Sequence, residues 1–100
     1  MNDTNYVGLE QDLANGLTPL ARIVLDARLF GLVAADESCA GWEPGRIQQL
    51  YERVFAAWAP YGHMPSNLPD GLRQQHAHMY AQSIETARRA GWDPELGDDD

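Results

Sequence analysis

Two histidines separated by one residue, His76 and His78, are the side chains best suited to metal binding or acid–base chemistry. Histidine titrates near neutral pH and is the commonest metal ligand. On a helix, however, side chains three or four positions apart share a face, whereas a separation of two turns them to different sides. Because both residues fall in a helical pattern, we expect His76 at the margin of the core and His78 in solvent. We predict no metal site.

Cys39 is the second candidate for chemistry, as a nucleophilic thiolate. The nearby acidic residues Asp36 and Glu37 should raise the pKa of its thiol and reduce its reactivity. A single cysteine also excludes an intrachain disulfide and a cysteine-based zinc site. We therefore expect a packed thiol in a reducing compartment.

Other sequence signatures of enzymes are missing. The sequence contains no lysine, which excludes Schiff-base chemistry and the phosphate-binding lysine of a P-loop. It also lacks the Gly-x-Gly-x-x-Gly fingerprint and the Gly-x-Ser-x-Gly elbow. We predict no catalytic residue and no cofactor.

Charge is unevenly distributed along the chain, whose net charge is −8. Residues 1–43 and 93–100 each carry a net charge of −5, whereas residues 44–92 carry +2. Acidic ends repel phosphate, so direct nucleic-acid binding is not expected. An acidic mimic of nucleic acid remains an alternative, although the nearly neutral middle of the chain counts against it.

Three helices should position these residues, and each is expected to begin at a proline that suits the first helical turn. They cover residues 19–34, 44–58 and 69–90. Thr18 should cap the first helix, whose apolar residues cover most of its circumference, so that either the chain itself or a partner must surround it. In the second helix, steps of three and four predict one core face, made of Ile47, Leu50, Tyr51, Val54, Phe55 and Trp58.

The predicted fold is an all-α small bundle of these three main helices, with a short N-terminal helix as an option. Glycines weaken the helical pattern of residues 1–17, and we expect a loose arm there. Residues 1–92 should form a single helical domain. Residues 93–100 should form an acidic flexible tail.

The loop between the second and third helices carries side chains typical of protein contact surfaces. They could equally fold back as a lid over the core. Trp92 follows a glycine near the end of the third helix and either covers that end or makes a contact. The predicted partner-binding residues are Trp58, Tyr61, His63, Met64 and Trp92.

We expect a non-enzymatic accessory, regulatory or inhibitory protein that acts by binding another protein, or itself as a homodimer. The alternative is a small enzyme or enzyme subunit that binds an anionic metabolite between helices, with His76 and Tyr80 beside arginines such as Arg46 and Arg53. The sequence shows neither a signal-peptide pattern nor a membrane span, which favours a cytoplasmic location.

Overall fold

The structure, a computed structural model, describes residues 5–93, and within that range it is all-helical. The helices and 3₁₀ turns are, in chain order, α1 (Leu9–Asp12), η1 (Leu13–Asn15), α2 (Pro19–Leu29), α3 (Pro44–Trp58), η2 (Ala59–Tyr61), η3 (Pro65–Asn67) and α4 (Asp70–Arg89). The predicted bundle of three main helices with a short N-terminal helix is therefore confirmed. The predicted acidic tail, apart from Asp93, lies outside the described residues.

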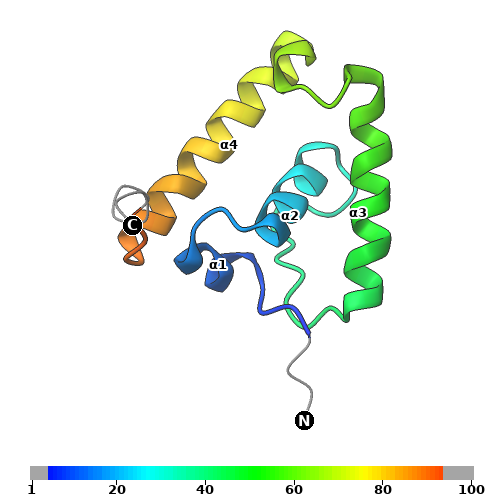
Figure 1. Cartoon of the computed structure of the whole chain (residues 1–100). Coiled ribbons are helices and arrows are strands. Elements are labelled where there is room, and N and C mark those ends of the chain that lie inside the picture. The colour runs from blue at the N-terminus through cyan, green and yellow to red at the C-terminus, as the bar shows by residue number, and fades with distance from the viewer. Residues whose placement is uncertain (1–4, 94–100) are drawn as a thin grey trace, which may run out of the picture.

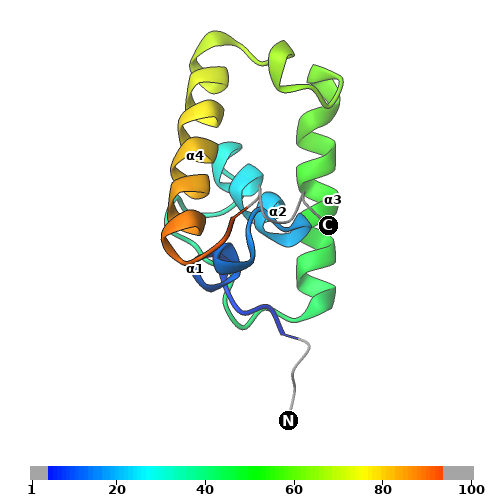
Figure 2. The same cartoon turned by 60° about the vertical axis from the view of Figure 1, so that its left-hand side comes forward.

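Helix α2 lies between α3 and α4, as both views of the ribbon show (Figures 1 and 2). The segment that contains η2 and η3 joins α3 to α4 at one end of the molecule, and α1 lies at the other end, beside the end of α4. The core fills the space around α2. Its buried apolar residues are Tyr6, Leu9, Leu13, Ala21, Val24, Leu25, Ala27, Leu29, Cys39, Ile47, Leu50, Val54, Trp58, Leu68 and Ala87.

Helix α2 starts as predicted but ends five residues early. The Thr18 hydroxyl accepts a hydrogen bond from the Ala21 amide at 3.0 Å, which caps the first turn. At the other end Gly31 adopts a left-handed conformation with φ of +72°. The Leu32 amide then donates to the Ala27 carbonyl at 2.8 Å, which closes the helix. The predicted extension to residue 34 was wrong, because it followed the apolar residues and ignored this glycine.

We expect Gly31→Ala to lower the free energy of unfolding by about 1 kcal/mol, because a left-handed conformation strains any residue with a Cβ atom. A Cβ atom at Gly31 would meet nothing within 4 Å, so backbone strain is the whole cost. Urea denaturation measures the change. Gly71, which lies within α4 and has equally open surroundings, is the matched control. Gly71→Ala should leave stability unchanged or raise it by up to about 1 kcal/mol, and equal losses in both variants would contradict the explanation.

The N-terminal segment is not a loose arm, which corrects the prediction for residues 5–17. Tyr6, Leu9 and Leu13 are buried, and their side chains hold α1 and η1 against the core. The Tyr6 amide also donates to the Trp42 carbonyl at 2.9 Å. The glycines that weaken the helical pattern mark its two boundaries. Gly8 precedes α1 and Gly16 follows η1, and both have positive φ values.

Helix α4 is the longest helix described, as predicted, with 20 residues. Gly91 has a positive φ of +107°, and the Trp92 amide donates to the Ala87 carbonyl at 3.0 Å, which closes the helix. The Trp92 indole lies against Gly16, where a Cβ atom would clash with Nε1. The end of α4 is thereby fixed to η1.

Candidate functional site

The two histidines occupy different environments, as their spacing predicts. His78 is exposed, whereas His76 is half-buried. The His76 ring stacks on Tyr80 at 4.4 Å and meets the edge of Trp58 at 5.9 Å, measured between ring centroids. Within residues 5–93 no group of three or more His, Cys, Asp or Glu side chains is arranged to hold a metal ion.

Asp26, at the middle of the molecule, joins the three main helices. Its carboxylate accepts hydrogen bonds from Trp58 Nε1 on α3, at 3.0 Å, and from the Tyr80 hydroxyl on α4, at 2.7 Å. Burial, and then the negative charge of Asp26, raise the pKa of Tyr80 far above its ordinary value. Tyr80 therefore stays protonated and acts as a hydrogen-bond donor, not as a base.

A hollow of about 480 Å³ opens beside this group, lined by Arg22, Asp26, Trp58, His76 and Tyr80 together with part of the η2–η3 segment. This is where a metabolite site based on His76 and Tyr80 would lie. Arg46 and Arg53 line a different hollow on the other side of α3. The structure therefore does not bring Arg46 and Arg53 together with His76 and Tyr80, as the enzyme hypothesis requires.

Cys39 is fully buried, and burial, followed by the negative charge of Glu37, raises the pKa of its thiol. The expected direction is confirmed, although Asp36 is not among the causes. A buried, protonated thiol is a poor nucleophile. Cys39 thus acts as a packing residue.

The predicted partner-binding residues do not form one surface. Trp58 belongs to the core, with 8% of its surface exposed. Trp92 packs on Gly16 at the end of the molecule opposite the η2–η3 segment. Tyr61 is half-buried and stacks on Phe30, with the ring centroids 6.3 Å apart.

His63 and Met64, in contrast, lie on the surface, where Met64 is 54% exposed. His63 has a left-handed φ of +60°, which is rare for a residue with a side chain and follows the left-handed Gly62. This conformation places the His63 ring 4.3 Å from the ring of Phe55 on α3. The loop therefore presents two of the five predicted residues beside an exposed aromatic side chain.

The apolar face of α3 is wider than the stripe that it buries, which the sequence interpretation missed. Ile47, Leu50, Val54 and Trp58 are buried, but Tyr51 and Phe55 are 42% and 53% exposed. A peripheral helix buries a limited arc, so residues at the edge of a broad apolar face remain in solvent. The breadth of that face was the available signal. Assigning Tyr51 and Phe55 to the core was wrong.

Five exposed residues lie in succession along this side of α3, and we call them the exposed apolar strip: Leu20, Tyr51, Phe55, His63 and Met64. Leu20 and Tyr51 line the same hollow, of about 370 Å³, between α2 and α3. The rings of Tyr51 and Phe55 are 6.2 Å apart, and Phe55 contacts His63. Met64 follows directly in the chain. The strip thus runs from α2 across α3 to the loop after η2.

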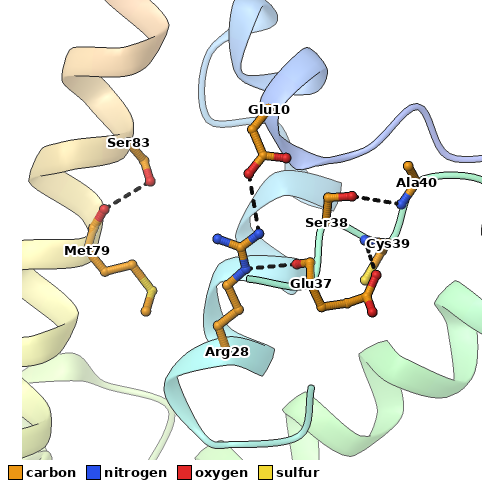
Figure 3. Close-up of polar contacts among 8 residues, drawn as sticks. All are labelled: Glu10, Arg28, Glu37, Ser38, Cys39, Ala40, Met79 and Ser83. Carbon is orange, nitrogen blue, oxygen red and sulfur yellow. Dashed lines mark hydrogen bonds and ion pairs between the residues drawn. The ribbon is translucent and has the colours of Figure 1, made fainter. Parts of the chain in front are cut away.

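On the opposite flank of α3, a hollow of about 310 Å³ is lined by Arg46 and Arg53 of α3 and by residues of the segment that follows α2. The Arg46 guanidinium carbon lies 3.6 Å from the centroid of the Trp42 ring. Figure 3 shows the hydrogen bonds that Glu37, a residue lining this hollow, makes with Arg28 and Cys39. We call this hollow the arginine pocket.

Comparison with known proteins gives no relationship from which a function could be transferred: no family model, curated protein or solved structure matches the chain. In the part of the chain that the structure describes, no helix combines the length and apolarity needed to cross a bilayer.

Proposed function

We propose that this chain is a non-enzymatic accessory protein, regulatory or inhibitory, that binds another protein through the exposed apolar strip. The observation that carries the proposal is the exposure of Tyr51 and Phe55 on a helix whose other apolar residues are buried. Contiguous exposed apolar surface is uncommon on proteins that act alone, and aromatic side chains supply much of the energy at protein interfaces.

The strip has features of a binding surface beyond its apolarity. Phe55 and His63 come from different elements, and the left-handed backbone at His63 holds its ring against Phe55. Such a conformation costs free energy and persists only where the surrounding structure supports it. The hollow beside Tyr51 could receive one apolar side chain of a partner.

The partner is a different protein, whose contact surface is apolar. Two copies of this chain each carry a net charge of −8 and repel one another, which disfavours a homodimer. Homodimerisation is the alternative that the experiment must distinguish. Two side chains that could in principle take part in catalysis are consistent with a binding role, since Tyr80 is kept protonated and the Cys39 thiol is buried.

We also propose that the protein works in the cytoplasm. Its one cysteine is unpaired and buried in the core, as suits a protein that needs no oxidising compartment.

The double substitution Tyr51→Ala and Phe55→Ala is expected to weaken binding of the partner by at least about 100-fold, because two aromatic anchors in a central contact are together worth about 2.8 kcal/mol or more. The partner is first captured with the wild-type chain from its native host and identified. Its affinity for purified wild-type and variant chains is then measured by calorimetry. Circular dichroism checks that the variant stays folded.

Ile84→Ala is the matched control, because Ile84 is partly exposed on α4 and lines a separate hollow with Arg88. It should leave affinity unchanged. Equal binding by the wild-type chain and the strip variant would contradict the proposal. Sedimentation showing a dimer that the strip substitutions dissociate would instead show that the strip binds a second copy, and the assignment to a different protein would be wrong.

A further inference from the structure

We propose that the arginine pocket binds a small organic acid, with Arg46 and Arg53 on its carboxylate and apolar side chains around its body. This site lies apart from the exposed apolar strip: Tyr51 and Arg53 are about 200° apart around the axis of α3, at 100° per residue. The inference therefore does not depend on the proposed function.

The two arginines are positioned to act together on one ligand. Arg46 and Arg53 are seven positions apart on α3, which is about two helical turns, and so they share a face with Gln49 between them. The ion pairs found among residues 5–93 engage other arginines, namely Arg28, Arg73 and Arg89. Arg46 and Arg53 take part in none of these ion pairs, so their guanidinium groups are available for an external anion.

Glu37, the acidic residue that lines the pocket, already has a partner. Its carboxylate accepts a hydrogen bond from the Cys39 amide at 2.9 Å, and its carbonyl accepts one from Arg28 Nε at 2.8 Å (Figure 3). These contacts fix Glu37 in the wall of the pocket. Two guanidinium groups against one carboxylate leave a local excess of one positive charge, which a single carboxylate of a ligand would neutralise.

The remaining walls determine the rest of the ligand. Leu32, Val33 and Trp42 are half-buried and present apolar surface to the hollow. The stacking of Arg46 on Trp42 holds this guanidinium at the border between the apolar and the polar part. The volume of about 310 Å³ lies at the small end of the range for ligand sites. These properties fit an organic monoanion with a short apolar body.

Titration calorimetry of the full chain with octanoate tests the assignment. We expect saturable binding of one molecule, with at least about tenfold weaker binding of octylamine, which reverses the charge, and of inorganic phosphate, which lacks the apolar body. Arg53→Gln should weaken octanoate binding at least about tenfold, since a charge-assisted hydrogen bond is worth 1.5 kcal/mol or more. Arg46→Gln should act likewise.

Arg73→Gln, on the exposed side of α4, is the matched control and should leave octanoate affinity unchanged. Because the stacking on the Trp42 ring involves Arg46, substitution of Arg53 keeps the test valid if Arg46→Gln disturbs the fold. Absence of saturable binding, equal affinity for octylamine, or unchanged affinity in Arg53→Gln would each overturn the proposal. Tighter binding of a peptide that ends in a free leucine carboxylate would show that the ligand is a chain end and not a free acid.

Discussion

Replacing Asp26 by alanine is expected to lower the free energy of unfolding by about 3 kcal/mol. The substitution removes two charge-assisted hydrogen bonds and leaves the indole of Trp58, which is 8% exposed, without an acceptor. The loss is large against the 5–15 kcal/mol typical of a whole domain. Urea denaturation followed by circular dichroism measures it. Asp26→Asn should be milder, because its amide oxygen can still accept from Trp58.

Asp36→Ala is the control for Asp26→Ala, since Asp36 is an exposed carboxylate in the loop after α2. It should change stability by less than about 0.5 kcal/mol. Combining Asp26→Ala with Tyr80→Phe should cost less than the sum of the two single changes, because both remove the same hydrogen bond. Strict additivity, or an Asp26→Ala variant as stable as the control, would show that Asp26 does not join the helices energetically.

Alkaline solution is expected to unfold the protein steeply above pH 10. Burial, assisted by a hydrogen bond to Asp12, raises the pKa of Tyr6, and burial with the charge of Asp26 raises that of Tyr80. Above the ordinary tyrosine pKa of 10.0, the unfolded chain therefore loses protons that the folded chain keeps. The stability that each tyrosine contributes is complete below pH 10 and should fall by about 1.4 kcal/mol per pH unit as pH rises above it. Cys39 adds a loss of the same sign from about its ordinary value of 9.0.

The measurement is the free energy of unfolding in urea at several values between pH 8 and 12. Tyr6→Phe and Tyr80→Phe should each reduce the slope above pH 10 by about one tyrosine's share, even though each also lowers stability at neutral pH. The slope isolates the titration from the lost hydrogen bond. An unchanged slope in both variants would show that these hydroxyl groups ionise as readily in the folded as in the unfolded chain.

Local sequence signals predicted the beginnings of the helices well. Thr18 with Pro19, and Pro44, mark real helix starts, and Gly91 closes α4. These residues act through backbone geometry within one turn, so that no knowledge of the tertiary structure is needed. Gly31 ends α2 by the same local rule, so the end of this helix could also have been predicted. The prediction instead followed the apolar residues on either side of Gly31.

The candidate sites depend on distant contacts that the sequence pattern did not contain. The breadth of the apolar face of α3 indicates that some of its residues stay exposed, but it does not say that these are Tyr51 and Phe55, because burial is decided by where α2 meets α3. The convergence of Trp58 and Tyr80 on Asp26 joins residues up to 54 positions apart. Such side-chain assemblies follow from the helix arrangement, which periodicity alone does not specify.

The packing of Trp92 on Gly16 has a consequence for how the molecule is made. Helix α1 and η1 belong to the core, and the surface that covers η1 is supplied by an indole more than seventy residues later. A nascent chain emerging from the ribosome lacks that cover until Trp92 has been synthesised and has left the exit tunnel. The contact between η1 and Trp92 can therefore form only late in synthesis, after the rest of the core residues have been made.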